Sequence, residues 1–258
     1  TEQYMRTKKK IRKIVTYSDT KTGQELRQRH EKILCYLREN SYPSIFAKAY
    51  VPYRGIFENA KAHLYNDIFL KMDIKSFFDS IDHNELQTQL YIQLNKVSEE
   101  YVTRAQCKDI VSVCSCNYPG LPLGLVTSPD LANLYLKSFD SLFYGKIKTY
   151  GLENPIYTRY ADDLIVSFKE CDNYVAICKS IRKDAMNLLR EYRLNLNDSK
   201  TEVVSLRETN HVRITGVSSI KDENDYRHIS VGKKLKNDLF WKAIEYYDHP
   251  ERASESDI

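Results

Sequence analysis

The chain has 258 residues, of which 42% are hydrophobic and 29% are charged, and its formal net charge at pH 7 is +4. These values are ordinary for a globular protein, and the length allows one large domain or two small ones. No apolar run approaches the roughly 20 residues of a membrane span, and there is no secretory signal, so we expect a cytoplasmic protein with no membrane partner. The six cysteines lack Cys-x-x-Cys spacing and a matching His cluster, which disfavours zinc and predicts reduced thiols.

Positive charge is concentrated in two short segments. The first contains Arg6, Lys8, Lys9, Lys10, Arg12 and Lys13, and the second contains Lys233, Lys234 and Lys236. Such blocks can neutralise phosphates and release their counterions, which favours a nucleic-acid partner. A solvated surface stretch is an equally good explanation of either block by itself.

The first part of the chain predicts a β-like start, a helix and a buried strand. Residues 1–20 are basic and polar and contain short β-like pieces. Residues 24–40 carry apolar side chains at three- and four-residue spacing, which predicts a helix. Residues 68–74 alternate apolar and other side chains, which predicts a strand with one buried face.

Two helices, a loop and a third helix are predicted next. Residues 84–96 and 98–114 have helical patterns, with Ser98 as the expected cap of the second. Residues 120–124 form a turn-rich loop, and Ser128-Pro129 is expected to begin the next helix with the serine as N-cap. The buried side of that helix is expected to contain Leu131, Leu134, Tyr135, Phe139 and Leu142.

The last part of the chain predicts a hairpin, a helix and a strand. Residues 156–168 read as two strands around a tight turn that carries Asp162 and Asp163. Asp172 is the expected cap of the helix that follows, and residues 194–206 return as a loop and a strand. The whole order predicts an α+β fold in which helices cover one face of an antiparallel sheet.

Acidic side chains stand at two places where apolar neighbours make them costly. Asp73 lies in a predicted buried strand, and Tyr160-Ala-Asp-Asp163 places two acids together at a hairpin tip. A buried carboxylate is unfavourable unless it is paired, and like charges this close need a positive charge between them. Mg²⁺ takes oxygen ligands and is held by few carboxylates together with substrate phosphates. The three aspartates therefore predict a site for two Mg²⁺ ions that serve a phosphoryl displacement.

Each of these pieces has a simpler explanation when it stands alone. A lone Asp-Asp pair is most often a pair of acids in a turn. The combination is more specific. An acid in an apolar strand, a Gly-rich loop leading into a capped helix, and an acidic hairpin follow one another in the order that a polymerase palm requires.

The sequence resembles the reverse transcriptases over nearly the whole chain, and in detail the bacterial retron-type and related antiviral-defence enzymes. Tyr160–Asp163 looks like the metal-binding motif of that family, and Asp73–Phe78 looks like its first aspartate motif. The resemblance implies that Asp73 and Asp162 bridge two Mg²⁺ ions and that Asp163 supports the site. It also implies help from the backbone carbonyl of Ile74, which places Ile74 at both the metal and the nucleotide.

Two further stretches resemble the palm motifs of the family. Leu121–Gly124 with Thr127–Leu134 is similar to the loop and helix under the template and the incoming nucleotide, which implies that Gly124 binds nucleotide. Leu196–Thr201 resembles the late palm motif whose lysine, here Lys200, lies near the leaving pyrophosphate. Lys200 is thus a candidate general acid, with a solvated loop lysine as the alternative.

Residues of the basic N-terminal segment and of the first aspartate motif are candidates for nucleotide binding. The segment around Arg12 is similar to the fingers hairpin that grips the triphosphate, which implies that Lys10 and Arg12 hold phosphates. Phe78 follows Asp73 by five residues, where a bulky ring would meet the 2′ position of the incoming sugar. Either Phe77 or Phe78 is expected to pack only in the core.

Two short stretches narrow the resemblance to retron enzymes. Asn59–His63 looks like their Asn-Ala-x-x-His signature, and Ile214–Gly216 resembles their Val-Thr-Gly element near the primer grip. The resemblance implies RNA-binding roles for Asn59, His63, Thr215 and Gly216. For His63, a structural histidine is an equally good interpretation.

The sequence also departs from the family pattern. Leu123 stands where many relatives have Gln, Leu125-Val126 replaces a common Ala-Pro, and Tyr17 stands where relatives often have Pro, so the template contacts are open. The stretch after Gly216 is short for a full thumb, and the chain begins at Thr1 rather than Met. We expect either a truncated chain or one that depends on RNA or on another subunit.

The resemblance implies a right-hand polymerase fold with fingers, palm and a short thumb. The expected parts are fingers over 1–71, the first palm strand over 72–83, a fingers insertion over 84–119, palm over 120–206, and primer grip with partial thumb over 207–258. The implied function is RNA-directed DNA polymerase in antiphage defence, with an RNA template, a cognate noncoding RNA, dNTPs and a DNA product. An effector or second protein subunit is a further expected partner.

Two functions of other classes remain open at this point. One is a catalytically silent palm that serves as an RNA-binding scaffold, against which the retention of all three aspartates argues. The other is a palm-type nucleotide cyclase, which needs no template grip and so leaves residues 120–134 and the basic segment unexplained. Retron and other defence enzymes differ mainly in their RNA, which the sequence does not reveal.

Overall fold

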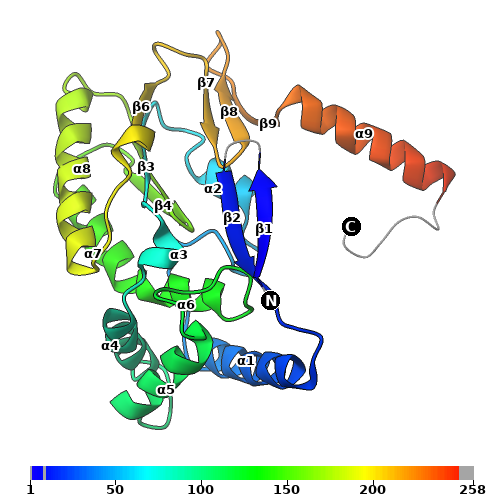
Figure 1. Ribbon diagram of the computed structural model, residues 1–258. Helices are drawn as coiled ribbons and strands as arrows, with labels where there is room; N and C mark the ends of the chain where they lie inside the picture. The colour runs from blue at the N-terminus through cyan, green and yellow to red at the C-terminus, as the bar shows by residue number, and fades with distance from the viewer. Residues whose placement is uncertain (1, 8–9, 250–258) are drawn as a thin grey trace.

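A computed structural model describes residues 2–7 and 10–249, with side chains described from Lys13 onwards except at 233–235. Figure 1 shows a twisted sheet flanked by helices, a smaller sheet beside it, a group of helices below, and an N-terminal hairpin in front. No helix of the described residues is long and apolar enough to cross a membrane. All six cysteines are free, as expected.

The central sheet has four antiparallel strands in the order β4-β5-β3-β6. The strands are β3 (Ile68–Asp73), β4 (Ile156–Tyr160), β5 (Asp163–Phe168) and β6 (Glu202–Ser205). The β4–β5 hairpin and β3 lie where the sequence predicted them. Because β3 is bracketed by β5 and β6, its backbone is paired on both edges.

One face of the central sheet is covered by helices, as predicted. Leu70, Met72, Leu164 and Val166 point to this face and belong to the main hydrophobic core. The same core includes buried side chains of α7 (Lys137–Lys148) and α8 (Tyr174–Glu191). Figure 1 shows both helices on the same side of the sheet.

The other face of the sheet carries a second, smaller core. Since side chains alternate along a strand, Phe69 and Ile165 point away from the main core and pack in this cluster. Its remaining members are Leu206, one residue of α2 (Ile56–Ala62) and three residues of the smaller sheet. The smaller sheet has the order β7-β8-β9, with β7 (His211–Ile214), β8 (Val217–Lys221) and β9 (Arg227–Val231).

Most of the remaining helices gather below the central sheet in Figure 1. They are α1 (Lys21–Glu39), α4 (His83–Leu94), α5 (Arg104–Ser115) and α6 (Ser128–Tyr135), with the short α3 (Phe77–Ser80) above them. Helix α1 begins where the Thr20 hydroxyl accepts a hydrogen bond from the Gly23 N–H.

Three elements lie at the edges of the fold. The N-terminal hairpin consists of β1 (Glu2–Thr7) and β2 (Lys10–Val15). The single 3₁₀ turn η1 (Asp198–Lys200) precedes β6. Helix α9 (Lys233–Asp248) extends away from the other elements in Figure 1 and exposes Phe240 and Trp241.

Two predicted helix caps, Ser98 and Asp172, were wrong. Ser98 does not cap a helix, because it follows the end of α4 and its N–H donates to Leu94 O. Helix α5 begins after Thr103, which forms a capping box with Gln106. Asp172 does not cap α8, which begins after Asn173.

The helix predicted from Ser128 is two helices, α6 and α7, separated at Leu136. Thr127 occupies the N-cap position, and the Ser128 hydroxyl donates to Pro122 O instead of capping. The break rotates the second helix relative to the predicted face. As a result Leu142 is 51% exposed, whereas Phe139 is buried as expected.

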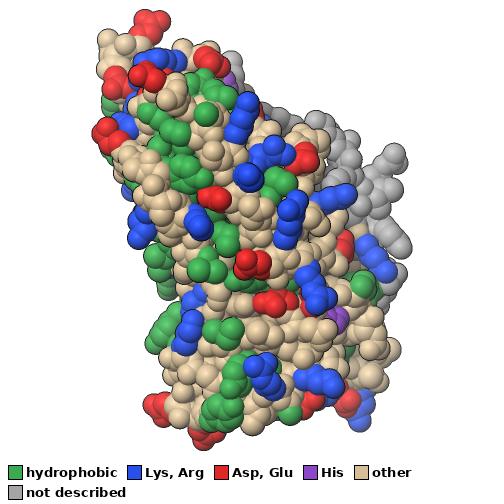
Figure 2. Space-filling model, turned by 90° about the vertical axis from the view of Figure 1, so that its left-hand side faces the viewer, with side chains coloured by type: hydrophobic (Ala, Val, Ile, Leu, Met, Phe, Trp, Pro, Cys, Tyr) green, Lys and Arg blue, Asp and Glu red, His purple; other side chains and the backbone are tan. Residues whose placement is uncertain are grey.

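Figure 2 shows the side on which α8 lies in Figure 1. Lys and Arg side chains are scattered over this face, and acidic and apolar side chains lie between them. The positive charge on this face is therefore distributed and does not mark a single binding patch.

Candidate functional site

Asp73 and Asp163 are directly opposite partners in the antiparallel pairing of β3 with β5. Directly opposite residues point to the same face of a sheet and have Cβ atoms about 4.5–5.5 Å apart. Both carboxylates lie on the face of Phe69 and Ile165, beyond the end of the second core. Asp73 is only 6% exposed, so its charge is held in a largely desolvated position.

Asp162 lies in the two-residue turn that joins β4 to β5. Ala161, the other turn residue, has a positive φ of 55° and is buried. The N–H of Ile74 donates to the Asp162 carbonyl at 2.9 Å, which ties the turn to the end of β3. The Ile74 side chain is fully buried in the main core, so only its backbone faces the candidate site.

The Asp163 carboxyl shows the cost of burial beside other carboxylates. Burial raises the pKa of Asp163 to about 6, with smaller contributions from the charges of Asp162 and Asp73. Lys200 forms an ion pair with Asp73, and the Asn197 amide donates to the second oxygen of Asp73 at 3.3 Å. Lys200 thus lies at the acids, where its ammonium partly balances their charge.

A cavity of about 300 Å³ opens at Asp73 and Asp163. Its lining includes Asp73, Asp163 and Lys200 together with Lys71, Met72, Leu164, Ile165, Arg213, Thr215 and Gly216. The structure therefore brings together five of the predicted site residues from four separate motifs. Lys71 is paired with Glu202 at 2.8 Å, which leaves Arg213 as a further basic group at the cavity.

The donor chemistry of this site fits a hard divalent cation. Among the described residues, no three His, Cys, Asp or Glu side chains already converge on one point as metal ligands. Even so, carboxylate oxygens from Asp73, Asp162 and Asp163 are the ligand type that Mg²⁺ prefers. Burial and, to a smaller extent, the charges of Asp162 and Asp73 raise the pKa of Asp163, and a bound cation would favour its ionised form.

The two phenylalanines after Asp73 have different surroundings. Phe77 is 3% exposed and belongs to the main core. Phe78 is half-buried and packs edge-on against Tyr50, with 6.3 Å between ring centroids. Phe78 is therefore the one of the pair that is available to a ligand, and Tyr50 is a neighbour that the sequence analysis missed.

The loop before α6 is held by both the N-terminal hairpin and the Phe78 backbone. The Val15 N–H donates to Leu123 O at 2.8 Å, and the Leu121 N–H donates to Phe78 O at 2.8 Å. Gly124 has φ of 109°, and a Cβ there would lie 2.6 Å from Val15 O. Only glycine fits this backbone conformation and this close approach.

The side chains of the two predicted phosphate-binding residues lie outside the described part of the structure. These residues, Lys10 and Arg12, lie in β2. The Nζ atom of Lys13, the residue after Arg12, lies 4.9 Å from the ring centroid of Tyr118.

The structure corrects the prediction that Asn59 and His63 contact RNA directly, because both side chains are fully buried and have no surface for such a contact. The two ring nitrogens of His63 are hydrogen-bonded to the hydroxyls of Ser167 and Thr158, each at 2.7 Å. Burial, with a smaller effect of Lys48, lowers the pKa of His63 to about 3, so the ring is neutral. His63 is a structural histidine.

Asn59 instead reaches the predicted primer-grip element. Its amide donates to the Thr215 hydroxyl at 3.2 Å. Thr215 and Gly216 form the turn between β7 and β8, both with positive φ, and both line the cavity. RNA contact through these two residues stays a prediction.

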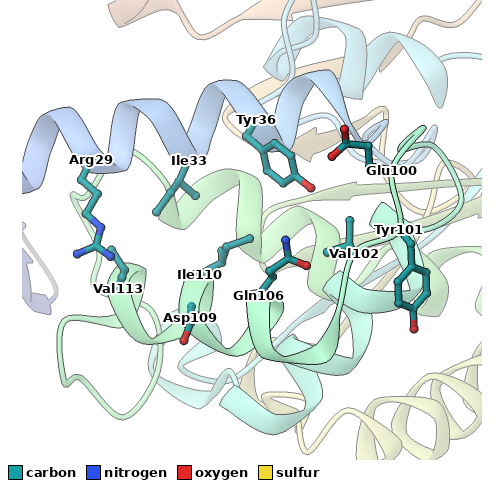
Figure 3. A pocket seen from close by; sticks show the side chains of 10 residues that line it. All are labelled: Arg29, Ile33, Tyr36, Glu100, Tyr101, Val102, Gln106, Asp109, Ile110 and Val113. Atoms are coloured by element: carbon teal, nitrogen blue, oxygen red, sulfur yellow. The ribbon is translucent and has the colours of Figure 1, made fainter.

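A cavity of about 350 Å³ lies far from the acids, between α1 and α5 (Figure 3). Ile33 of α1 and Ile110 of α5 form its apolar floor, and Arg29, Gln106 and Asp109 lie around it. It contains none of the residues of the aspartate site, and we assign it no role.

A protein-family model, several curated relatives and several solved structures match this chain. The family model described as reverse transcriptase (RNA-dependent DNA polymerase) matches residues 7–230. The chain therefore belongs to the reverse transcriptase family, as its motifs predicted.

Several curated relatives are retron enzymes. The retron Ec73 reverse transcriptase of Escherichia coli is 26% identical over 194 residues, which is 74% of this chain and 60% of that protein. The retron Ec83 enzyme of the same species is 28% identical over 216 residues, or 79% and 63%. The retron Mx65 enzyme of Myxococcus xanthus is 26% identical over 234 residues, or 83% and 52%. The chain thus spans between 52% and 63% of the length of these three relatives.

Solved structures confirm the predicted α+β polymerase fold. Apo telomerase from Candida tropicalis, truncated from its C-terminal domain, aligns with a TM-score of 0.59 and 14% identity, over 90% of this chain and 54% of that one. Telomerase from Candida albicans in complex with a fragment of telomeric RNA aligns with a TM-score of 0.57 and 11% identity, over 85% and 45%. At such identities the likeness establishes the fold alone.

Proposed function

We propose that this protein is an RNA-directed DNA polymerase that uses two Mg²⁺ ions. The observation that carries the proposal is the opposition of Asp73 and Asp163 on β3 and β5, next to Asp162, in a chain of the reverse transcriptase family. Neighbouring carboxylates without a counter-charge cost stability, because burial, with smaller contributions from the charges of Asp162 and Asp73, raises the pKa of Asp163 to about 6. A cation-dependent reaction explains why they are retained.

In this proposal Asp73 and Asp162 hold both ions and Asp163 supports them, with the Ile74 carbonyl nearby. When bound, the ions supply charge for the attacking and leaving oxygens of an in-line displacement. The chain's own groups position the reactants. Phe78 limits the space at the 2′ position of the sugar, with Gly124 and its loop beside it.

Lys200 has a second role in this proposal. Its ammonium already lies at Asp73, within reach of a group that leaves from the same place. Because it is partly exposed, it can exchange its proton with solvent and donate it to the departing pyrophosphate. Lys10 and Arg12 hold the triphosphate from the hairpin side.

The finer features of the proposal rest on the retron relatives. We assign 1–71 and 84–119 to fingers, 72–83 and 120–206 to palm, and 207–258 to primer grip and partial thumb. The cognate partner is a structured noncoding RNA that supplies template, primer or both, and the biological role is antiphage defence in the cytoplasm. An effector or second subunit completes the complex.

The activity is tested by dNTP incorporation on a primed RNA template with Mg²⁺, using wild type and the variants Asp162→Asn and Asp163→Asn. Both variants should fold and lose incorporation, because each removes ligand charge and little volume. Asp172→Asn, an exposed acid at the start of α8, is the matched control. Wild-type rates in both test variants would remove these residues from the reaction.

The same preparation separates the other functions. A nucleotide cyclase would convert a nucleoside triphosphate without template, and a silent scaffold would bind RNA without incorporation. The RNA partner is tested by sequencing nucleic acid that survives a high-salt wash of the purified protein, since phosphate contacts weaken steeply with salt. A random RNA population would contradict a cognate RNA.

A further inference from the structure

Arg159 of β4 is the largest side chain that is fully buried among the described residues. A buried guanidinium is costly unless its donors are paired. Asp140 of α7, also fully buried, accepts from Arg159 Nε at 2.9 Å and from Nη2 at 2.9 Å. The Tyr157 hydroxyl donates to the same Asp140 carboxylate at 2.8 Å, which fixes its orientation.

The remaining guanidinium nitrogen, Nη1, reaches the turn formed by Ala161 and Asp162, which we call the aspartate turn. Arg159 Nη1 donates to the Ala161 carbonyl at 3.4 Å and to Asn133 Oδ1 at 3.0 Å. Ala161 directly precedes Asp162 and has a positive φ, which is unfavourable for a residue with a Cβ. The bond to Arg159 therefore helps to hold a strained turn in the conformation that presents Asp162.

Through Asn133, the same Nη1 atom is linked to the wall beside Phe78. The Asn133 amide donates to the Ala49 carbonyl at 2.9 Å. The backbone of Arg159 also pairs with the same segment, through Arg159 N to Phe46 O and Lys48 N to Arg159 O, both 2.8 Å. Tyr50, which follows Ala49, has φ of 59° and packs against Phe78.

We propose that Arg159 is a positioning residue that sets both the aspartate turn and the Tyr50–Phe78 wall. The inference rests on the proposed polymerase function, and it adds a group that touches neither nucleotide nor metal. Its planar fork is needed, because one guanidinium bonds Asp140, Asn133 and Ala161 at once. A purely structural ion pair would need only the charge.

The first variant is therefore Arg159→Lys. A lysine keeps the charge opposite Asp140 but has no fork to bond Asn133 and Ala161. We expect a folded protein whose half-saturating Mg²⁺ concentration for dNTP incorporation rises about 10- to 100-fold, as for other residues that orient metal ligands. Its rNTP/dNTP selectivity should change as well. Arg207→Lys, at an exposed arginine that pairs with Glu170, is the matched control and should change neither quantity.

The second variant separates the link to the aspartate turn from the link to the Tyr50–Phe78 wall. Asn133→Ala keeps the Arg159–Asp140 pair and removes the link to Ala49. We expect a larger change in dNTP KM and sugar selectivity than in the Mg²⁺ requirement. If Arg159→Lys does not fold, the double variant Arg159→Met with Asp140→Leu replaces it, since it leaves no unpaired buried charge. The same shift in Mg²⁺ requirement is expected there.

The outcomes distinguish this inference from the proposed function. If wild type incorporates no dNTP, the polymerase function itself is wrong. If wild type is active and a folded Arg159→Lys, or the double variant in its place, keeps the wild-type Mg²⁺ requirement and selectivity, Arg159 is only structural. Wild-type KM and selectivity in Asn133→Ala would overturn the link to the wall.

Discussion

Asp73 and Asp163 stand opposite each other across β3 and β5, and Lys200 forms its ion pair with Asp73. The register that makes this pair is set by the main core. Leu70, Met72, Leu164 and Val166 must all face the helices, so the alternate positions on the same strands face the cavity. The clustered charge is therefore a consequence of how the sheet packs, and it has measurable effects.

We predict that Asp163→Asn stabilises the metal-free protein while abolishing dNTP incorporation. The pKa of Asp163 is raised to about 6 from 3.8, so the ionised carboxylate disfavours the folded state at higher pH. The free energy of unfolding should rise in the variant by on the order of 1–3 kcal/mol above pH 6, and the gain should vanish below about pH 4, where the acid is neutral in both states. Thermal melting in EDTA at pH 8 and pH 4 measures it. A variant that melts below wild type at pH 8 would contradict the prediction.

The Mg²⁺ requirement should depend on pH for the same reason. A metal ligand must be deprotonated, so Mg²⁺ competes with a proton at Asp163 below pH 6. The half-saturating Mg²⁺ concentration should be nearly constant between pH 7 and 8 and rise about tenfold per pH unit well below 6. Incorporation assays over a Mg²⁺ series at each pH measure it. A requirement that is flat down to pH 5 would show that Asp163 does not contact metal.

Phe78→Ala should raise ribonucleotide incorporation relative to deoxynucleotides. Phe78 is half-buried beside Tyr50, and its loss opens space without emptying the core. Phe77→Ala is the contrasting variant, because Phe77 is 3% exposed and its loss should cost about 3–5 kcal/mol of stability. Competition between rNTP and dNTP on one template measures the selectivity. Unchanged selectivity in an active Phe78→Ala would leave sugar discrimination to another residue.

His63→Ala should destabilise the protein without changing the RNA affinity of its folded fraction. The change leaves the buried Thr158 hydroxyl without its partner, at a cost of about 1–3 kcal/mol, whereas the Ser167 hydroxyl keeps its hydrogen bond from the Asn66 amide. In wild type, the lowered pKa of His63 makes stability fall as pH drops from about 6.5 towards 3, since only the unfolded state takes up the proton. Urea unfolding and RNA binding of the same samples test both points. Reduced RNA affinity at wild-type stability would restore a direct role for His63.

Gly124→Ala should weaken nucleotide binding, because the new Cβ forces the loop away from Val15 O. The positive φ adds strain of about 1–3 kcal/mol. Gly145→Ala in α7 is the control, because a Cβ there has nothing within 4 Å and should be neutral or slightly stabilising. Both the dNTP KM and the melting temperature are measured. Equal behaviour of the two variants would show that the loop tolerates a Cβ.

Local patterns were sufficient to predict the three aspartates and the sheet that carries them. The alternation in β3 and the acidic turn are properties of a few adjacent residues, so the sequence reports them directly. The capping box of Thr103 and Gln106 was also readable, since its spacing is local, and it was overlooked in favour of Ser98.

Residues that depend on distant contacts could not be predicted in the same way. Arg159 and Asp140 are 19 positions apart on different elements, and nothing local says that the arginine is buried. The break at Leu136 turned Leu142 outwards, although its spacing suited a continuous helix. His63 was undecided because its hydroxyl partners, Ser167 and Thr158, are about a hundred residues away.

The bond from Val15 to Leu123 also fixes where the N-terminal hairpin can pivot. Strand β2 runs from Lys10 to Val15, so the backbone of Lys10 is roughly 16 Å from the bonded end. If the hairpin tilts by about 20° about Val15, the backbone of Lys10 moves by roughly 5–6 Å while the loop at Gly124 stays in place. Under the proposed function, such a tilt would move the backbone of Lys10 and Arg12 relative to the loop that contains Gly124.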